Sequence, residues 1–97
     1  MFDPIEKAID AIKEGKMIIV VDDEERENEG DLVMAAEKVT PETMAFIIRY
    51  TGGVVCLSLD QKIANQLELP LMVAHSTAKR GTAYTISIDA ADVMTGI

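Results

Sequence analysis

The densest group of chemically reactive side chains lies at residues 22–31. This acidic stretch holds one arginine, one glycine and seven of the chain's seventeen acidic residues, namely Asp22, Asp23, Glu24, Glu25, Glu27, Glu29 and Asp31. Neighbouring carboxylates repel one another and lose water at a cost, so such a group is usually balanced by a cation or by hydrogen-bond donors. The stretch is therefore the first candidate for a site of chemistry.

The spacing within the stretch indicates a hard cation. Glu27, Glu29 and Asp31 stand at alternate positions, and their side chains would share one side if the backbone there is extended. Magnesium takes one or two protein carboxylates, keeps several waters and shares its other positions with a phosphate or polyol substrate. Arg26 adds donors for a substrate oxygen or a carboxylate. Close packing also raises the pKa of some carboxylates, so one of them could carry a proton.

The acidic stretch has other possible interpretations, and His75 and Cys56 are further candidate site residues. A calcium-binding EF-hand loop that starts at Asp22 would need Asp or Asn at its fifth position and Gly at its sixth. Arg26 and Glu27 occupy these positions, so the EF-hand pattern does not fit. A solvated acidic loop stays open on composition alone. His75, the one histidine, is expected in an exposed loop rather than on a metal, and Cys56 is expected to be a small buried strand residue.

The acidic stretch is expected to be a loop held between two strands. Residues 17–21 are apolar and rich in β-branched side chains, which is typical of a short strand buried on both faces. Residues 32–36 become apolar again and predict a second strand. The connection at 23–30 is then fixed at both ends, so it can hold a geometry that a free acidic tail could not.

One helix is predicted before these strands in the sequence and another after them. Asp3 is expected to cap a helix that begins at Pro4 and ends at Gly15. Thr40, followed by a proline, repeats this signal for a second helix that runs to Tyr50.

The rest of the chain continues the alternation of strands and helices. A strand is predicted at 54–59, a short helix capped by Asp60, a loop at 70–81, and a half-buried strand at 82–90. The predicted fold class is therefore α/β or α+β, a mixed β-sheet flanked by helices, within one domain. The last residues, 93–97, carry no terminal signal, so we expect the domain to continue beyond them.

Composition excludes several classes of function. The 97 residues are 48% hydrophobic and 27% charged, which indicates a globular chain. A net charge of -8 argues against binding to nucleic acid or to an anionic membrane. No apolar run approaches the length of a membrane span. With one cysteine and no leader-like start, the protein is expected in the cytoplasm.

The order of residues at 22–31 is more specific than their composition, because it closely resembles the acidic-loop signature of the 3,4-dihydroxy-2-butanone 4-phosphate synthase family of riboflavin biosynthesis. Segments at 53–56, 69–73, 81–89 and 95–97 resemble later parts of that family, in the same order. The resemblance thus covers essentially the whole chain. It implies the synthase fold for the predicted sheet and helices.

The resemblance implies a lyase that uses magnesium or manganese to convert ribulose 5-phosphate to 3,4-dihydroxy-2-butanone 4-phosphate and formate, at sites shared across a homodimer. It implies that Glu27 binds the metal and takes part in substrate binding and catalysis. Arg26 and Asp31 would contact the substrate. Glu29 and Cys56 would act in catalysis at the same site.

The family also carries a later Arg-x-Gly-His-Thr segment, whose histidine is the second metal ligand, and this segment is not among the 97 residues. We therefore expect residues 1–97 to be the N-terminal part of one synthase domain and to lack half of the metal site when alone. Two alternatives stay open. One is a non-catalytic acidic module that binds a divalent ion or a basic partner, and the other is a bifunctional chain with a GTP cyclohydrolase II-like domain.

Overall fold

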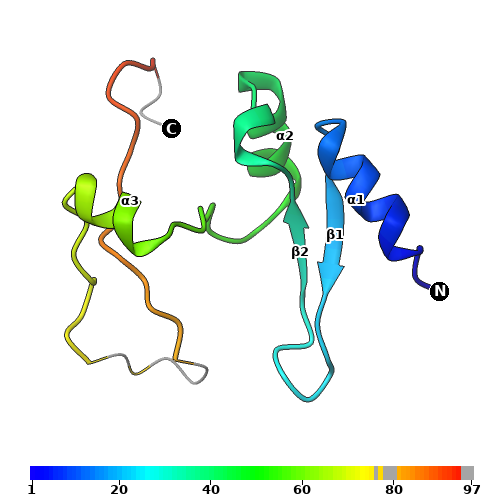
Figure 1. Cartoon of the computed structure of the whole chain (residues 1–97), viewed down its shortest axis with the longest axis horizontal. Coiled ribbons are helices and arrows are strands. Elements are labelled where there is room, and N and C mark those ends of the chain that lie inside the picture. Colours follow the sequence, from blue (N-terminus) through cyan, green and yellow to red (C-terminus); the bar gives the residue numbers. More distant parts are fainter. Residues whose placement is uncertain (76, 78–80, 95–97) are drawn as a thin grey trace. The chain divides into compact units, whose positions relative to one another are not determined.

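Two units make up the chain, Met1–Leu57 and Ser58–Ile97. The computed structural model describes residues 1–75, 77 and 81–94, and the ribbon is shown in Figure 1. The described residues form helices and a small antiparallel sheet, which confirms the predicted combination of helices and sheet. The prediction for the loop at 70–81 lies partly outside the described residues.

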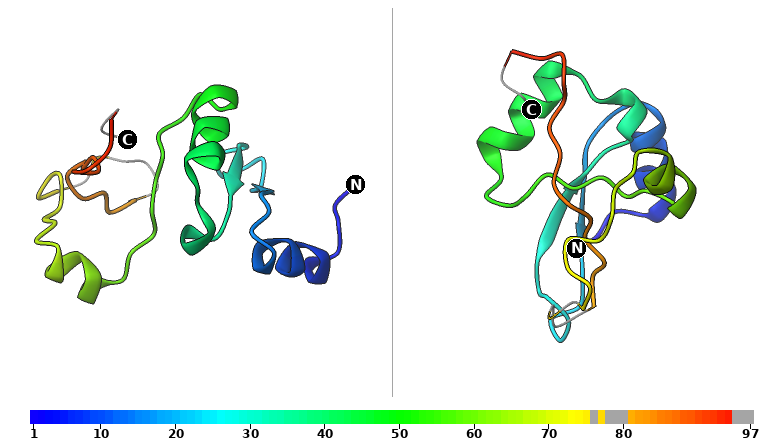
Figure 2. Two further views of the ribbon diagram at one scale, coloured as in Figure 1. Left: turned by 90° about the horizontal axis from the view of Figure 1, so that it is seen from above. Right: turned by 90° about the vertical axis from the view of Figure 1, so that its left-hand side faces the viewer.

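The first unit is organised around a β-hairpin. Strand β1 (Ile18–Val21) pairs in antiparallel fashion with β2 (Gly30–Val33), so that Val21 faces Gly30 at the loop end. Figures 1 and 2 show the connecting loop projecting beyond the helices of this unit. The hairpin confirms that the acidic loop is held at both ends by strands.

The second strand begins and ends earlier than predicted. It was expected at 32–36, yet the antiparallel ladder starts at Gly30 and continues on the loop side through the N–H of Asp22, which donates to the carbonyl of Glu29 (3.3 Å). After Val33 the backbone leaves the ladder for a short 3-10 helix, η1 (Ala36–Lys38). Asp31 is therefore a strand residue rather than a loop residue.

Burial of β1 on both faces was predicted, and the structure contradicts it. Ile19 is 72% exposed and Val21 is 48% exposed. A strand buried on both faces needs a covering layer on each side of its sheet. In the described part of the chain the sheet has two strands, so much of its apolar surface stays open.

The first helix, α1 (Ile5–Lys13), forms within the predicted range, but it does not have the predicted cap. Asp3 was expected to cap it. Instead Pro4 takes the N-cap position with extended backbone and no side-chain cap hydrogen bond. The Asp3 carboxylate accepts a hydrogen bond from Lys7 Nζ at 3.1 Å, so it is directed at a side chain four residues on. Gly15, with φ +78°, follows the helix end as predicted.

The second helix, α2 (Pro41–Tyr50), confirms the predicted cap. The Thr43 N–H donates to Thr40 Oγ1 (3.1 Å), and the Thr40 N–H donates to Thr43 Oγ1 (2.8 Å). Two backbone donors that the helix itself cannot satisfy are thereby paired.

In the second unit, the short helix α3 (Gln61–Gln66) is capped as predicted, because Asp60 Oδ1 accepts from the N–H of Ile63 at 2.8 Å. The strands predicted at 54–59 and 82–90 are not formed in the described residues. Residues 82–90 contribute one isolated bridge, between Leu71 and Thr85.

That bridge is flanked by two backbone hydrogen bonds, from the N–H of Met72 to the carbonyl of Tyr84 (2.9 Å) and from the N–H of Ile86 to the carbonyl of Pro70 (3.0 Å). The predicted burial of alternate residues is also wrong, since Tyr84, Ile86 and Ile88 are exposed. An apolar alternation forms a strand only where a long enough partner pairs with it.

Among the described residues, Ala64 alone is buried. No helix in this part of the chain has the length and apolar character needed to cross a membrane. The hairpin is held by backbone and side-chain hydrogen bonds, and it carries the predicted site residues Arg26, Glu27, Glu29 and Asp31.

Candidate functional site

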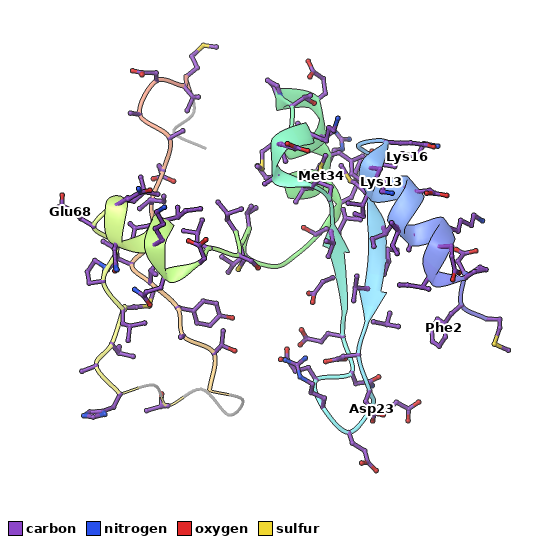
Figure 3. All side chains as sticks on the ribbon, viewed as in Figure 1. Phe2, Lys13, Lys16, Asp23, Met34 and Glu68 are labelled. Atoms are coloured by element: carbon purple, nitrogen blue, oxygen red, sulfur yellow. The ribbon has the colours of Figure 1, made fainter. Side chains whose placement is uncertain are left out.

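The acidic loop closes by tight turns rather than by extended backbone. The N–H of Arg26 donates to the carbonyl of Asp23 (2.9 Å), and the N–H of Asn28 reaches the same carbonyl (3.3 Å). The Asp23 carboxylate also accepts from the N–H of Glu25 (2.8 Å). Asn28 has φ 53°, a left-handed conformation that asparagine adopts more readily than most residues. Figure 3 shows Asp23 at the end of the hairpin, among oxygen-bearing side chains.

These turns contradict the predicted arrangement of three carboxylates on one side. Glu27 and Glu29 flank the left-handed Asn28, so their side chains do not follow the alternation of an extended strand. Asp31 lies in β2, paired with Val20. In the part of the chain that the structure describes, no three His, Cys, Asp or Glu side chains are placed to hold one metal ion together.

Asp22 is the centre of hydrogen bonding in the loop. Its Oδ1 accepts from the N–H of Glu29 (2.9 Å). Its Oδ2 accepts from the N–H of Glu27 (3.2 Å) and from Arg26 Nη1 (2.7 Å). The Asp22 side chain is 21% exposed, whereas that of Arg26 is 53% exposed. We call this set of three hydrogen bonds the Asp22 network.

The Asp22 network sets the charge of one loop carboxylate. Crowding was expected to raise the pKa of some carboxylates in the stretch, and for Asp22 the shift is in the other direction. The N–H of Glu29, supported by the side chain of Arg26 and the N–H of Glu27, instead holds the pKa of Asp22 below its usual value, against the opposing effect of desolvation. Asp22 is therefore held ionised, which makes it a structural anion rather than a proton carrier.

Arg26 bridges two carboxylates. Its Nη1 contacts Asp22 Oδ2 at 2.7 Å, and its Nη2 contacts Glu27 Oε1 at 3.0 Å. The hydrogen bond to Asp22 and the charge of Glu27 raise the pKa of Arg26 above its usual value. The guanidinium thus places positive charge among the loop carboxylates while half of its side chain stays open to solvent.

The structure brings four predicted site residues together in the hairpin, with Arg26, Glu27 and Glu29 in the loop and Asp31 on β2. Cys56 lies outside the hairpin, in the irregular stretch after α2. The prediction that Cys56 is buried is wrong, since its side chain is exposed. The strand predicted at 54–59, which would have contained Cys56, is not formed.

The sequence predicted the environment of His75 but not the role of Asp22. His75 is exposed, as expected for a loop histidine. Sequence reasoning missed the role of Asp22 as the residue that ties the loop together. The available signal was its position, because an aspartate directly after a strand commonly accepts hydrogen bonds from the backbone of the following turn.

The carboxylate of Glu27 is a suitable ligand for a hard divalent ion. The Glu27 side chain is 38% exposed and offers carboxylate oxygen, the ligand that magnesium prefers. Magnesium also accepts a site with one or two protein carboxylates, where waters and substrate oxygens fill the other positions. The described residues therefore suit part of a magnesium site rather than an enclosed cage.

Comparison with known sequences gives a consistent result along the chain. The family model for 3,4-dihydroxy-2-butanone 4-phosphate synthase matches residues 6–97. The synthase of that name from Candida albicans is 56% identical over 98 residues, which cover 100% of this chain and 48% of that protein. Riboflavin biosynthesis protein RibBA from Bacillus subtilis is 52% identical and is covered over 24% of its length.

Solved structures agree with these relatives. A 3,4-dihydroxy-2-butanone 4-phosphate synthase in complex with two magnesium ions has a TM-score of 0.86 and 49% identity, over 92% of this chain and 41% of that one. The Candida albicans synthase structure has a TM-score of 0.75 and 55% identity, over 95% of this chain and 44% of that one.

The chain spans about half the length of the synthases it matches and about a quarter of RibBA. Within that span the agreement is continuous, since the family model begins at Glu6 and reaches Ile97. On this ground the chain belongs to the 3,4-dihydroxy-2-butanone 4-phosphate synthase family.

Proposed function

We propose that the natural protein carrying this chain converts D-ribulose 5-phosphate to 3,4-dihydroxy-2-butanone 4-phosphate and formate, as a lyase of riboflavin biosynthesis. The observation that supports this most is the family match over residues 6–97, which includes the whole acidic loop. The hairpin adds physical support, because it holds charged side chains in an ordered and open loop.

In this proposal Glu27 is the metal ligand of the loop and also contributes to substrate binding and catalysis. Its partly exposed carboxylate is held beside Arg26. Arg26 and Asp31 bind the substrate, and the planar guanidinium suits phosphate or paired oxygens. Glu29 and Cys56 act in catalysis, Glu29 as a carboxylate able to move a proton at a substrate hydroxyl or carbon.

Magnesium is the proposed metal, with manganese as the alternative. When bound, such an ion polarises a carbonyl oxygen and stabilises negative charge on neighbouring substrate oxygens. A solved relative holds two magnesium ions, which supports a divalent ion here. Glu27 would supply one ligand, with the remaining ligands drawn from substrate, water and polypeptide outside the described residues.

We further propose that both units are parts of one synthase domain, that the protein is a cytoplasmic homodimer, and that its site lies at the subunit interface. The family match crosses the boundary between the units without interruption, which supports a single domain. The partial ligand set in the described residues fits a site that other polypeptide completes.

A direct test uses the natural protein at full length, with ribulose 5-phosphate and magnesium, and measures formate. Glu27→Gln should lower kcat/KM at least about 100-fold, because it removes a charged group that stabilises the transition state. Glu24→Gln removes the same charge from an exposed loop position and should stay within about twofold of the wild type. If the wild-type protein releases no formate with magnesium and none with manganese, the proposal is refuted.

A bifunctional protein is a second candidate context. It is favoured by relatives such as the probable bifunctional riboflavin biosynthesis protein RIBA 1 of Oryza sativa, which is 56% identical over 91 residues and is covered over 17% of its length. The mass of the natural protein decides between the two contexts, since a bifunctional chain would be several times longer than residues 1–97.

A further inference from the structure

Asp22 has no role in the site proposed above, yet its carboxylate accepts three hydrogen bonds within the hairpin loop. One oxygen accepts from the N–H of Glu29, on the strand side of the loop. The other accepts from the N–H of Glu27 and from the Arg26 guanidinium. A single side chain at the end of β1 therefore fixes both limbs of the turn.

The Asp22 network fixes the proposed ligand-binding residues in two ways. It holds the backbone of Glu27 directly, through the N–H of that residue. It also holds the guanidinium of Arg26, whose other nitrogen lies 3.0 Å from Glu27 Oε1. The position of the Glu27 carboxylate is thus set from the backbone and from its charged neighbour.

The chemistry of the network requires a carboxylate at this position. Every partner is an N–H donor, and both oxygens of Asp22 accept. An asparagine offers one acceptor oxygen and one NH2 donor. In either orientation its NH2 would face a donor, so one limb of the loop would lose its anchor.

We propose that Asp22 is a positioning residue that sets the geometry of Arg26 and Glu27 for binding of the divalent metal and the phosphorylated substrate. The inference rests on the proposed function, for which a magnesium-bound relative and the family match give independent support. Partners that orient a metal ligand typically contribute a factor of about 10–100 to metal affinity or activity.

The test compares Asp22→Asn with two matched controls in the full-length natural protein. Asp23→Asn removes the neighbouring charge but can keep its single acceptor contact to the N–H of Glu25. Glu24→Gln removes one exposed charge outside the Asp22 network. Binding of Mn²⁺ is measured by electron paramagnetic resonance without substrate, amide exchange is measured at Glu27 and Glu29, and formate release gives KM and kcat.

Asp22→Asn should weaken Mn²⁺ binding about tenfold or more, speed amide exchange at Glu27 and Glu29, and raise the KM for ribulose 5-phosphate. Both controls should bind Mn²⁺ within about twofold of the wild type. Wild-type Mn²⁺ affinity in Asp22→Asn would overturn the inference. An equal loss in all three variants would overturn it too, because charge alone would then explain the effect.

Two further outcomes separate this inference from the proposed function. If the wild-type protein binds Mn²⁺ but releases no formate, the proposed function fails, while the Mn²⁺ affinities still decide the role of Asp22. If the wild-type protein binds no Mn²⁺, the inference is overturned as well. Should Asp22→Asn not fold, Asp22→Glu replaces it, since it keeps the charge but displaces the oxygens, and an unchanged Mn²⁺ affinity would contradict the inference.

Discussion

A single partly exposed carboxylate, that of Asp22, shows how the loop tolerates its charge. The carboxylate of Asp22 accepts hydrogen bonds from three N–H groups. The positive charge of Arg26 also offsets the negative charge of a second carboxylate, that of Glu27. Hydrogen bonds to an ionised group are stronger than neutral ones. The remaining acids of the stretch are exposed, in the loop and at Asp31 of β2, where solvent screens their repulsion.

The Asp22 network should respond to acid. The pKa of Asp22 in the folded hairpin lies below its ordinary value of 3.8. A depressed folded pKa means that the ionised form stabilises the fold, fully above the unfolded pKa and progressively less as pH falls through the folded pKa. Titration of the Asp22 carboxyl by nuclear magnetic resonance should therefore give a midpoint below 3.8, together with a shift of the Glu29 amide signal. A midpoint at or above 3.8 would contradict the network.

Among helices and strands, those specified by neighbouring residues were predicted correctly, whereas those that need partners far away in the sequence were not. The helix α2 was predictable because the Thr40 cap and the following proline lie next to the element that they start. The hairpin was predictable because two apolar runs flank one charged loop. The strands expected at 54–59 and 82–90 depend on distant partners, which no local pattern specifies, and in the described residues they are replaced by one bridge.

The same distinction applies to the candidate site. Sequence order placed Arg26 and Glu27 in one loop, and the structure shows them in contact. The geometry of the loop depends on the left-handed Asn28 and on hydrogen bonds from the backbone to Asp22. Spacing alone does not specify such turns, which is why the expected row of three carboxylates was wrong.

The cap of α2 can be tested by two substitutions at one position. Thr40→Ala removes the oxygen that accepts from the N–H of Thr43, and it should lower the free energy of unfolding by about 1 kcal/mol. Thr40→Ser keeps that oxygen and should stay close to the wild type. Urea unfolding of the full-length protein measures both. Equal stability of the Ala and Ser variants would show that the cap does not stabilise the helix.

The end of α1 offers a second test at this scale. Gly15 has φ +78°, and a Cβ added there would lie 3.3 Å from Lys38 Cβ. Gly15→Ala should therefore lower the free energy of unfolding by about 1–2 kcal/mol, the cost of a left-handed residue with a side chain. Gly52 is the matched control, because its backbone is not left-handed and an added Cβ would meet nothing within 4 Å. Similar losses at both glycines would contradict this explanation.

For the whole molecule, the described residues leave much apolar surface open. Side chains on the strands and helices of the first unit are exposed, including Ile19, Phe46 and Tyr50, and Ala64 is the buried residue of the described chain. Solved relatives are more than twice as long as the segment they share with this chain, which covers 41% and 44% of two of them. Stability of such a fold requires burial of apolar surface, which is the dominant favourable term in folding.

A polypeptide of residues 1–97 alone should therefore bind a dye that reports apolar surface and should unfold without a sharp cooperative transition. It should also release no formate from ribulose 5-phosphate, since the described residues do not assemble a full set of metal ligands. The full-length protein is the control and should show the opposite behaviour in all three measurements. Cooperative unfolding of residues 1–97 without dye binding would mean that these residues bury a core of their own, beyond the packing around Ala64.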